Sequence, residues 1–322
     1  MFGTRERVLV TGGAGFIGSH LTERLVNDGW DATVFDDFND SYDSRIKRDN
    51  LSGVLPHIKL IEGDIRDAVL VERCFVQGRF DPVVHLAARA GVRPSIQQPK
   101  LYMTTNIEGT FNLIDSCRHH EVGNFIFASS SSVYGVNQKA PFSETDPIGR
   151  TISPYAATKL ASEQICSNYS HLFGIRTRCL RFFTVYGPRQ RPDLAIAQFC
   201  RAILDGKTIT RFGDGHSRRD YTYVDDIVRG IMTSFDDKGG DYEVINLGGS
   251  ATTRLSDLIS MLEDALGREA KIQQAPEQPG DVPLTHADIG KAQDMLGWNP
   301  TFPLRQGLQS YVEWLRMKKT LV

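Results

Sequence analysis

The chain has 322 residues, of which 40% are hydrophobic and 24% are charged, an ordinary balance for a globular protein of about two domains. Its 37 Lys and Arg residues are balanced by 39 Asp and Glu residues, for a formal net charge of −2. This balance argues against a generic role in binding nucleic acid or an anionic membrane, because the chain as a whole does not attract a polyanion.

The cysteines and apolar runs indicate a soluble, cytoplasmic chain. The five cysteines are widely spaced and form no C-x-x-C pair, which disfavours a disulfide framework and a zinc site. We therefore expect reduced thiols and no metal. No apolar run approaches the roughly 18 residues that span a bilayer. The N-terminal residues lead directly into a strand-like run and do not resemble a signal peptide.

Short β-branched runs alternate with longer stretches of helical periodicity in the first part of the chain. This alternation is typical of a parallel sheet whose strands are joined by helical crossovers. We therefore predict an α/β fold with a Rossmann-like, doubly wound parallel sheet. Strands are expected at residues 8–10, 32–35, 58–61, 82–86, 125–128 and 177–182, and helices at 17–27, 101–119 and 155–173.

The chain changes character after Phe183, where turn-rich segments separate shorter helices. We expect an NAD-binding domain at residues 1–182, with a returning segment at about 222–248, and a smaller α/β substrate-binding domain at 183–221 and 249–322. Asp225 and Asp226 are expected to cap the helix of the returning segment. A surface loop is predicted at 273–283 and an amphipathic helix at 303–318.

A glycine-rich turn lies between the first predicted strand and the first predicted helix. Gly12, Gly15 and Gly18 have a G-x-x-G-x-x-G spacing, with Phe16 and Ile17 in the same turn. Glycines here permit a tight turn, close approach of a pyrophosphate to the backbone and close packing of helix on strand. The phosphates then lie at the helix N-terminus. The spacing predicts a dinucleotide-binding turn.

Acidic residues after the second strand indicate which dinucleotide binds. Asp36 lies about 20 residues beyond the glycines, where a carboxylate accepts hydrogen bonds from the adenosine ribose. Asp37 and Asn39 follow it. Two carboxylates would repel a 2′-phosphate, and the first arginine after them is Arg45, so NAD is favoured over NADP. After the third strand, Asp64 and Ile65 are either adenine contacts or ordinary turn residues.

Tyr155 and Lys159 lie four residues apart at the start of a predicted helix. This spacing places a phenol and an ammonium group on one helix face. The serine-rich strand end at 129–132 delivers hydroxyl groups to the carboxyl edge of the sheet, where ligands bind in such folds. A nearby lysine and a cationic nicotinamide would stabilise the phenolate and lower the pKa of Tyr155. Tyr155 would then act as a general base for an alcohol proton.

Together these features resemble the extended short-chain dehydrogenase/reductase superfamily over nearly the whole chain. The segments 85–95, 181–188 and 218–226 are similar to those of nucleotide-sugar 4-epimerases, above all UDP-glucuronate 4-epimerases. The resemblance implies that Ser130 binds the sugar 4-hydroxyl, that Tyr155 takes its proton, and that Lys159 orients the tyrosine and the nicotinamide ribose. It implies further NAD contacts at Leu86, Ala87, Ala88, Asn106 and Phe183, and UDP contacts at Arg219, Gln278 and Asp281.

Two serines distinguish this chain from relatives that remove water or carbon dioxide. Related 4,6-dehydratases have Asp-Glu, and decarboxylases have Glu, before the Val-Tyr-Gly that follows the strand; this chain has Ser131 and Ser132. We therefore favour oxidation at C4 and re-reduction on the other face, from UDP-glucuronate to UDP-galacturonate. Ser131, Ser132 and Thr184 are expected to hold the uronate carboxylate. Arg191 and Arg93 are expected near phosphate or sugar.

Other functions stay open from sequence alone, namely UDP-glucose 4-epimerase, UDP-glucuronate decarboxylase and a non-catalytic dinucleotide-binding sensor. Galactose-type epimerases usually have Arg near position 278 and Asn at position 184, so glucose is the weaker fit. The intact catalytic set argues against a sensor.

The family also suggests a homodimer in which helices 101–119 and 155–173 of two copies form a four-helix bundle. Ile165, Tyr169, Leu172, Leu113 and Ile114 supply apolar positions for such a bundle, although burial inside one copy would produce the same pattern.

Overall fold

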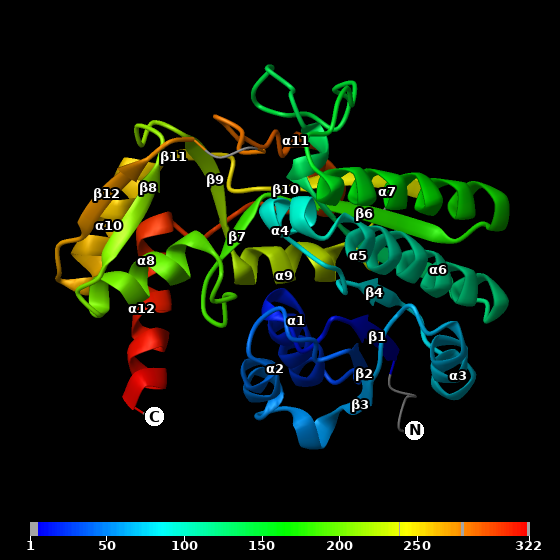
Figure 1. Cartoon of the computed structure of the whole chain (residues 1–322). Helices are drawn as coiled ribbons and strands as arrows, with labels where there is room; N and C mark the ends of the chain where they lie inside the picture. The colour runs from blue at the N-terminus through cyan, green and yellow to red at the C-terminus, as the bar shows by residue number, and fades with distance from the viewer. Residues whose placement is uncertain (1–5, 238, 278–279, 321–322) are drawn as a thin grey trace.

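The central feature of the fold is a seven-stranded sheet, seen in a computed structural model that describes residues 6–237, 239–277 and 280–320 (Figure 1). The strand order is β10-β6-β5-β4-β1-β2-β3, and every neighbouring pair is parallel. The predicted doubly wound α/β fold is thus confirmed. The strands are β1 (Arg7–Thr11), β2 (Asp31–Asp36), β3 (Lys59–Glu62), β4 (Val83–His85), β5 (Asn124–Ser130), β6 (Arg176–Phe182) and β10 (Tyr242–Leu247).

Both faces of this sheet are covered, which explains why its strands are apolar runs rather than alternating ones. Leu9 and Phe125 pack on one face in a cluster with Cys179, whereas their neighbours Val10 and Ile126 pack on the other. The covering helices are α1 (Phe16–Asn27), α2 (Ser44–Leu51), α3 (Ala68–Gly78), α4 (Val92–Gln97), α5 (Pro99–Met103), α6 (Gly109–His119), α7 (Pro154–Phe173) and α9 (Val224–Thr233).

The helix predicted at 101–119 is interrupted. A π-helical turn, η2 (Thr104–Glu108), joins α5 to α6, and such turns occur often at functional sites. The periodicity of apolar residues continues across the turn, so the sequence pattern did not show the interruption.

A smaller part of the molecule lies beside the sheet and has its own apolar cluster (Figure 1), which includes Ile196, Leu258, Leu308 and Tyr311. It contains a three-stranded sheet, β11-β9-β7, and a two-stranded sheet, β12-β8. Its elements are β7 (Thr184–Tyr186), α8 (Ala195–Leu204), β8 (Thr208–Phe212), β9 (Arg218–Tyr223), β11 (Thr252–Arg254), α10 (Leu255–Leu266), β12 (Lys271–Ala275) and α12 (Leu304–Thr320). Helix α11 (Gly290–Leu296) packs on β10 of the main sheet instead.

The chain passes between the two parts more than once. After β9, helix α9 leads back to β10, which pairs with β6 from Tyr242 opposite Thr177 to Leu247 opposite Phe182. The division into an NAD-binding and a substrate-binding domain at the stated boundaries stays a prediction. Short 3-10 turns, η1 (Leu55–His57) and η3 (Ser131–Tyr134), complete the described elements.

Two local predictions were wrong. Asp225 and Asp226 lie in the first turn of α9, whose N-cap residue is Tyr223. The buried Asp226 carboxylate instead accepts hydrogen bonds from the backbone N–H groups of Thr301 and Phe302, so it anchors the segment before α12. The predicted loop at 273–283 begins inside β12, whose exposed, polar residues lack the apolar pattern of a buried strand.

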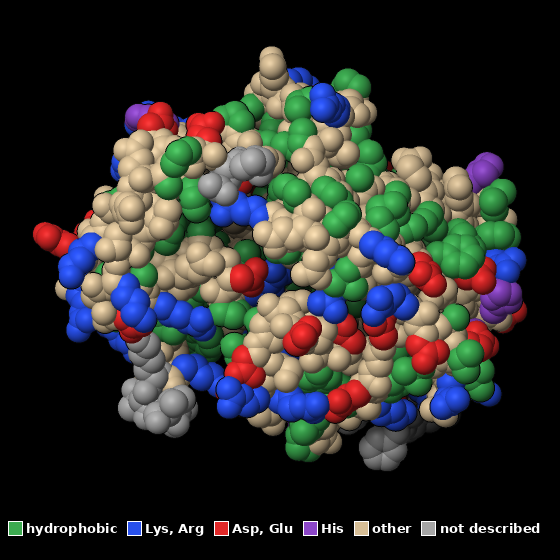
Figure 2. Space-filling model, viewed as in Figure 1, with side chains coloured by type: hydrophobic (Ala, Val, Ile, Leu, Met, Phe, Trp, Pro, Cys, Tyr) green, Lys and Arg blue, Asp and Glu red, His purple; other side chains and the backbone are tan. Residues whose placement is uncertain are grey.

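Charges are mixed on the face shown in Figure 2, where acidic and basic side chains lie interspersed. Within residues 6–237, 239–277 and 280–320, no helix combines the length and apolar character needed to cross a membrane. The five cysteines are free and buried.

Candidate active site

The turn after β1 can form only with glycine at two positions. Gly12 has a φ of +70°, and a Cβ atom there would lie 2.7 Å from the backbone nitrogen of Ala87. A Cβ atom on Gly18 would lie 2.1 Å from the carbonyl oxygen of Gly12. Helix α1 therefore packs directly on the turn, with Gly15 at its N-cap and Phe16 and Ile17 in its first turn. The bare backbone at this helix N-terminus is suited to phosphate groups.

The Asp36 carboxylate faces this turn from the end of β2. Its Oδ2 accepts a hydrogen bond from the Ala14 nitrogen at 3.1 Å, and its Oδ1 accepts one from Phe38 at 3.0 Å. Asp37 in turn accepts a hydrogen bond from the backbone nitrogen of Asn39 at 3.1 Å. The predicted ribose-binding acid and the glycine turn are thus in direct contact.

Lys47 was missed by the sequence analysis, which considered only arginines as cations near these acids. Its Nζ lies 2.9 Å from Oδ1 of Asp36 and 3.5 Å from Oδ1 of Asp37, with a side chain that is 7% exposed. The available signal was a lysine in the first helix after two adjacent carboxylates. Part of the negative charge at this edge is therefore compensated within the protein.

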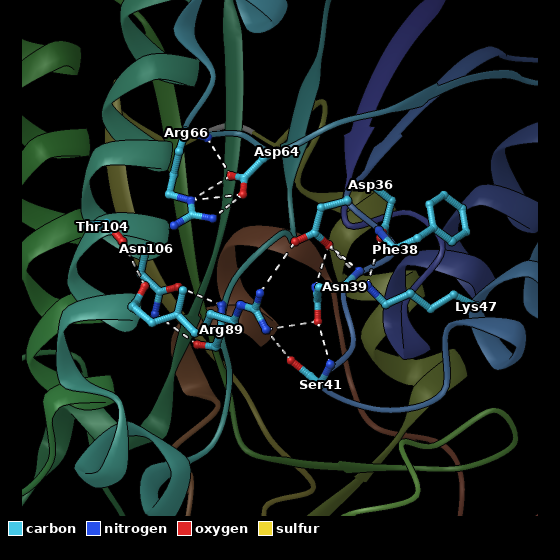
Figure 3. Close-up of polar contacts among 12 residues, drawn as sticks. Asp36, Phe38, Asn39, Ser41, Lys47, Asp64, Arg66, Arg89, Thr104 and Asn106 are labelled. Carbon is cyan, nitrogen blue, oxygen red and sulfur yellow. Dashed lines mark hydrogen bonds and ion pairs between the residues drawn. The ribbon is translucent and has the colours of Figure 1, made fainter.

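Asp64, after β3, pairs with Arg66 (Figure 3), and it also accepts a hydrogen bond from the Arg66 backbone nitrogen at 2.9 Å. The Arg66 guanidinium lowers the pKa of this carboxyl group. These contacts are those of a turn residue, and contact of Asp64 with adenine stays a prediction. Ile65 is buried, and its side chain fills the space above Gly109.

The loop after β4 lies against the glycine turn and carries Leu86, Ala87 and Ala88, all partly buried. Asn106, from the π-helical turn, fixes the end of this loop through the backbone of Arg89. It accepts from the Arg89 nitrogen at 2.8 Å and donates to the Arg89 carbonyl at 3.0 Å. Phe183, after β6, is buried beside Tyr134 and Phe142.

Ser130 and Tyr155 meet at the carboxyl edge of the sheet. Ser130 ends β5, and Tyr155 lies in the first turn of α7, whose start is set by Ser153: its hydroxyl accepts a hydrogen bond from the Ala156 nitrogen at 3.1 Å. Burial raises the pKa of the Tyr155 phenol, and hydrogen bonding with Ser130 and the charge of Arg191 oppose that rise. In the protein alone Tyr155 is therefore a neutral phenol at neutral pH.

Lys159 lies one helical turn further along α7 and is buried. Its Nζ donates to the carbonyl oxygen of Ala128 at 2.7 Å and lies 4.7 Å from the centre of the Phe127 ring. Burial lowers the pKa of this ammonium group to about 8. The sequence analysis expected the lysine to lower the tyrosine pKa, whereas the cation that does so in this structure is Arg191.

The predicted carboxylate-binding hydroxyls lie at the ends of two adjacent strands. The Ser130 and Ser132 hydroxyl oxygens are 3.1 Å apart in the turn after β5, next to Ser131. Thr184 begins β7, two residues beyond Phe182, which pairs with Ser130. These hydroxyl groups therefore belong to the same edge of the sheet as the phenol.

The predicted phosphate-binding arginines come from both parts of the molecule. Arg93 pairs with Asp281 at 2.8 Å. Arg219 donates a hydrogen bond to the carbonyl oxygen of Arg218. Burial and the charge of Arg93 lower the pKa of the Arg219 guanidinium, and the charge of Asp281 acts in the opposite direction. These three side chains thus form one cluster. Gln278 lies outside the described residues.

Arg191 lies on the catalytic side of the site. It pairs with Asp193 and donates to the Ala90 carbonyl at 3.2 Å. Tyr102, which the sequence analysis missed, donates to the same carbonyl at 3.0 Å, and its ring lies edge-on to that of Tyr155 with centroids 6.2 Å apart. Tyr102 therefore helps to orient the phenol, although it carries no sequence signal apart from its helix.

A buried ion pair supports the strand end from below. Glu163, one turn beyond Lys159, pairs with Arg181 at 2.8 Å, and the two side chains are 1% and 4% exposed. The Ser129 hydroxyl donates to the Glu163 carboxylate. The strand end that carries Ser130 is thereby tied to helix α7.

Comparison with known proteins places the chain among nucleotide-sugar enzymes. Residues 9–311 match the family described as GDP-mannose 4,6 dehydratase. UDP-glucuronate 4-epimerase 1 of Arabidopsis thaliana is 42% identical over 95% of this chain and 76% of that protein.

Two solved structures have the same fold with a TM-score of 0.91. UDP-glucuronic acid 4-epimerase from Bacillus cereus, in complex with UDP-glucuronic acid and NAD, is 37% identical over 97% of this chain and 99% of that one. UDP-glucose 4-epimerase from Thermotoga maritima, with UDP-glucose, is 36% identical over 98% of this chain and 100% of that one.

The depressed pKa of Lys159 predicts a pH-dependent cost to stability in protein stripped of nucleotide. Between pH 8 and the ordinary lysine pKa of 10.5, the unfolded state binds more protons than the folded state, so the free energy of unfolding rises with pH. Relative to Lys159→Met, we expect the wild-type chain to gain up to about 3 kcal/mol across this interval. Urea unfolding of both proteins as a function of pH measures the difference, and parallel curves would refute it.

Proposed function

The chain belongs to the GDP-mannose 4,6-dehydratase-like family of extended short-chain dehydrogenases/reductases, and from that membership we propose that it converts UDP-glucuronate to UDP-galacturonate by epimerisation at C4. It is an NAD-dependent UDP-sugar 4-epimerase, and hence an isomerase. The observation that supports the uronate substrate is the cluster of hydroxyl groups at the ends of β5 and β6, in which Ser131 and Ser132 stand where related dehydratases and decarboxylases have carboxylates.

The residues at the glycine turn fit NAD. The turn has no room for side chains at Gly12 and Gly18, so the pyrophosphate can approach the backbone. Asp36 is the proposed partner of the adenosine ribose. The other proposed contacts are Gly15, Phe16, Ile17, Asp37, Asn39, Asp64, Ile65, Leu86, Ala87, Ala88, Asn106, Tyr155, Lys159 and Phe183. When bound, NAD supplies an oxidised nicotinamide that accepts a hydride and returns it.

Tyr155 is the proposed base and acid of the reaction. In the first half, the phenolate takes the proton of the sugar 4-hydroxyl while the C4–H hydride departs, which leaves a 4-keto sugar. The keto sugar rotates, and its other face receives the hydride while Tyr155 returns the proton to the oxygen. Proton and hydride are both restored, so there is no net redox change. Ser130 holds the oxygen at C4, and Lys159 orients the tyrosine and the nicotinamide ribose. The positive charges that favour phenolate are that of Arg191 and, when NAD is bound, that of the oxidised nicotinamide.

The uronate requires a further restraint. A 4-keto uronic acid is a β-keto acid, which loses carbon dioxide when the bond to its carboxylate aligns with the carbonyl π system. We propose that Ser131, Ser132 and Thr184 hold the carboxylate near the ring plane by charge-assisted hydrogen bonds. Similarity to UDP-glucose 4-epimerase of Thermotoga maritima keeps UDP-glucose as the second candidate substrate.

The UDP group is proposed to lie against the part of the site built from β9 and its neighbours. Arg219 is partly buried, and its guanidinium donates to the backbone carbonyl of Arg218, so it retains donors for a pyrophosphate. Arg93 and Asp281 adjoin it, and the charge of Arg191 acts on Tyr155. Contact of Gln278 with UDP stays a prediction.

We also propose that two copies associate through α5, α6 and α7, which lie side by side in Figure 1. Phe111, Leu172 and Phe173 are 45%, 65% and 44% exposed on these helices, and Tyr169 lies beside Phe111 and Phe173. Leu113 and Ile114 are fully buried within one copy, so they are core residues and not part of the bundle surface. A cytoplasmic location stays a prediction.

The reaction is tested by incubating the protein with UDP-glucuronate and separating the products, which should include UDP-galacturonate. Tyr155→Phe should lower kcat about 100-fold to 10,000-fold, because a positioned proton-transfer group contributes that much. Its bound NAD should remain. Tyr311→Phe, a buried tyrosine in α12, is the matched control and should keep wild-type turnover. Full activity of Tyr155→Phe, or release of a UDP-pentose and carbon dioxide by the wild type, would refute the proposal.

The carboxylate site is tested by the double variant Ser132→Ala, Thr184→Val. Loss of charge-assisted hydrogen bonds should lower kcat/KM for UDP-glucuronate about 10-fold to 100-fold. Carbon dioxide release per turnover should rise, and any turnover of UDP-glucose should not fall. Thr208→Val, on the exposed start of β8, serves as the control. Unchanged uronate turnover would place the carboxylate elsewhere.

The association surface is tested by Leu172→Lys. Light scattering should show the wild-type chain at twice its 36.0 kDa mass and the variant as a single copy, because a charge would be buried at the interface. Leu55→Lys, at a leucine that is 48% exposed in η1, should remain a dimer. A single-copy wild type would contradict this arrangement.

A further inference from the structure

Arg89 links two loops on either side of the glycine turn, and the proposed function assigns it no role. Its Nη1 donates to Oδ1 of Asn39 at 3.1 Å and to the Ser41 hydroxyl (Figure 3). Its Nη2 lies 3.9 Å from Oδ2 of Asp37. The side chain is 14% exposed. The Arg89 side chain and its partners Asp37 and Asn39 are thus partly buried, and Ser41 lies at the exposed end of the set.

The strand order makes this link cross the cofactor turn. Arg89 follows β4, whereas Asn39 and Ser41 follow β2, and β1 lies between those two strands in the sheet. Strands on either side of a third are about 10 Å apart, a gap that an arginine side chain and its partners can bridge. The guanidinium therefore reaches across the strand end that carries the phosphate-binding glycines.

One end of the link is rigid. The Arg89 backbone is held in both directions by the side-chain amide of Asn106, whose Nδ2 also donates to the Thr158 hydroxyl at 2.9 Å. Thr158 lies between Tyr155 and Lys159 on α7. The loop after β2 is thus fastened to the catalytic helix through Arg89 and Asn106.

The charges at the link are matched in pairs. Lys47 lies on Asp36, and Arg89 lies near Asp37, so two carboxylates face two cations. The Arg89 Nε is buried and has no hydrogen-bond partner within the described ranges, which leaves it one donor for a bound molecule. Arginine suits this position because its planar fork reaches two acceptors at once, which lysine does not.

We infer that Arg89 is a positioning residue that retains NAD, by strapping the loop after β2 to the loop after β4 across the cofactor. The inference rests on the proposed function, because an epimerase must return the hydride that it removed before the cofactor can leave. An enzyme that exchanges its cofactor in each cycle would gain nothing from such a strap.

The test measures NAD retention directly. Protein is loaded with NAD, freed of excess nucleotide by gel filtration, and its NAD content is followed over time. Arg89→Ala should release NAD about 10-fold faster or more, since it removes hydrogen bonds from a charged group. Its turnover should stop when an NAD-hydrolysing enzyme is added and return to near the wild-type kcat with excess NAD. Arg89→Lys should release NAD at a rate between those of the wild type and Arg89→Ala.

Variants at other positions separate the strap from general damage. Ser41→Ala removes one partner of the guanidinium and should speed release less, and adding it to Arg89→Ala should have little further effect, because the two residues act together. Arg305→Ala removes an exposed arginine paired with Asp264 and should behave as wild type.

The outcomes distinguish this inference from the proposed function. The inference that Arg89 retains NAD is wrong if Arg89→Ala keeps NAD as long as the wild type does. It is also wrong if this variant keeps NAD and still loses turnover. A wild-type chain that releases NAD readily also overturns it. If the wild type holds NAD but leaves UDP-glucuronate unchanged, the proposed substrate fails while the retention result stands.

Discussion

The side-chain amide of Asn106 holds together three segments that are far apart in the chain. It binds the backbone of Arg89 in the loop after β4 and the hydroxyl group of Thr158 on α7. Asn106 lies in the π-helical turn between α5 and α6. Its backbone carbonyl accepts hydrogen bonds from the Thr110 and Ser162 hydroxyl groups. The side chain and the backbone of this one residue thus both hold helix α7 against the loop after β4, beside the glycine turn. A buried amide with all its groups paired fixes geometry more strictly than apolar packing does.

Local motifs allowed the sheet, the glycine turn and the Tyr155/Lys159 pair to be predicted, because each depends on spacing within a few residues. Contacts between loops that are distant in the chain have no comparable spacing pattern in the sequence. Lys47 and Arg89 are ordinary basic residues in the sequence. Lys47 reaches the acids from the helix that follows β2, whereas the strand order brings Arg89 to them from the loop after β4. Asp226 was read as a helix cap because it stands at a helix start, whereas its partners lie near residue 301. Tertiary contacts of this kind cannot be read from periodicity.

The chemistry of this site depends on which side chains follow a strand end rather than on the fold. Ser131 and Ser132 occupy positions where related enzymes with the same scaffold have acids for removing water or carbon dioxide. A hydroxyl group can bind a carboxylate without taking part in proton transfer at neutral pH, whereas a carboxyl group there can give or take a proton. Small changes at the end of β5 therefore select among reactions that share one oxidised intermediate.

The Glu163–Arg181 pair beneath the strand end is almost inaccessible to water, and mobile ions cannot screen a pair that they do not reach. The Arg93–Asp281 pair at the proposed UDP site is different, with side chains 46% and 39% exposed. Ionic strength therefore acts unevenly on this molecule. Added salt screens the exposed pair at the proposed UDP site, while the pair that ties the end of β5 to helix α7 is out of reach of the ions.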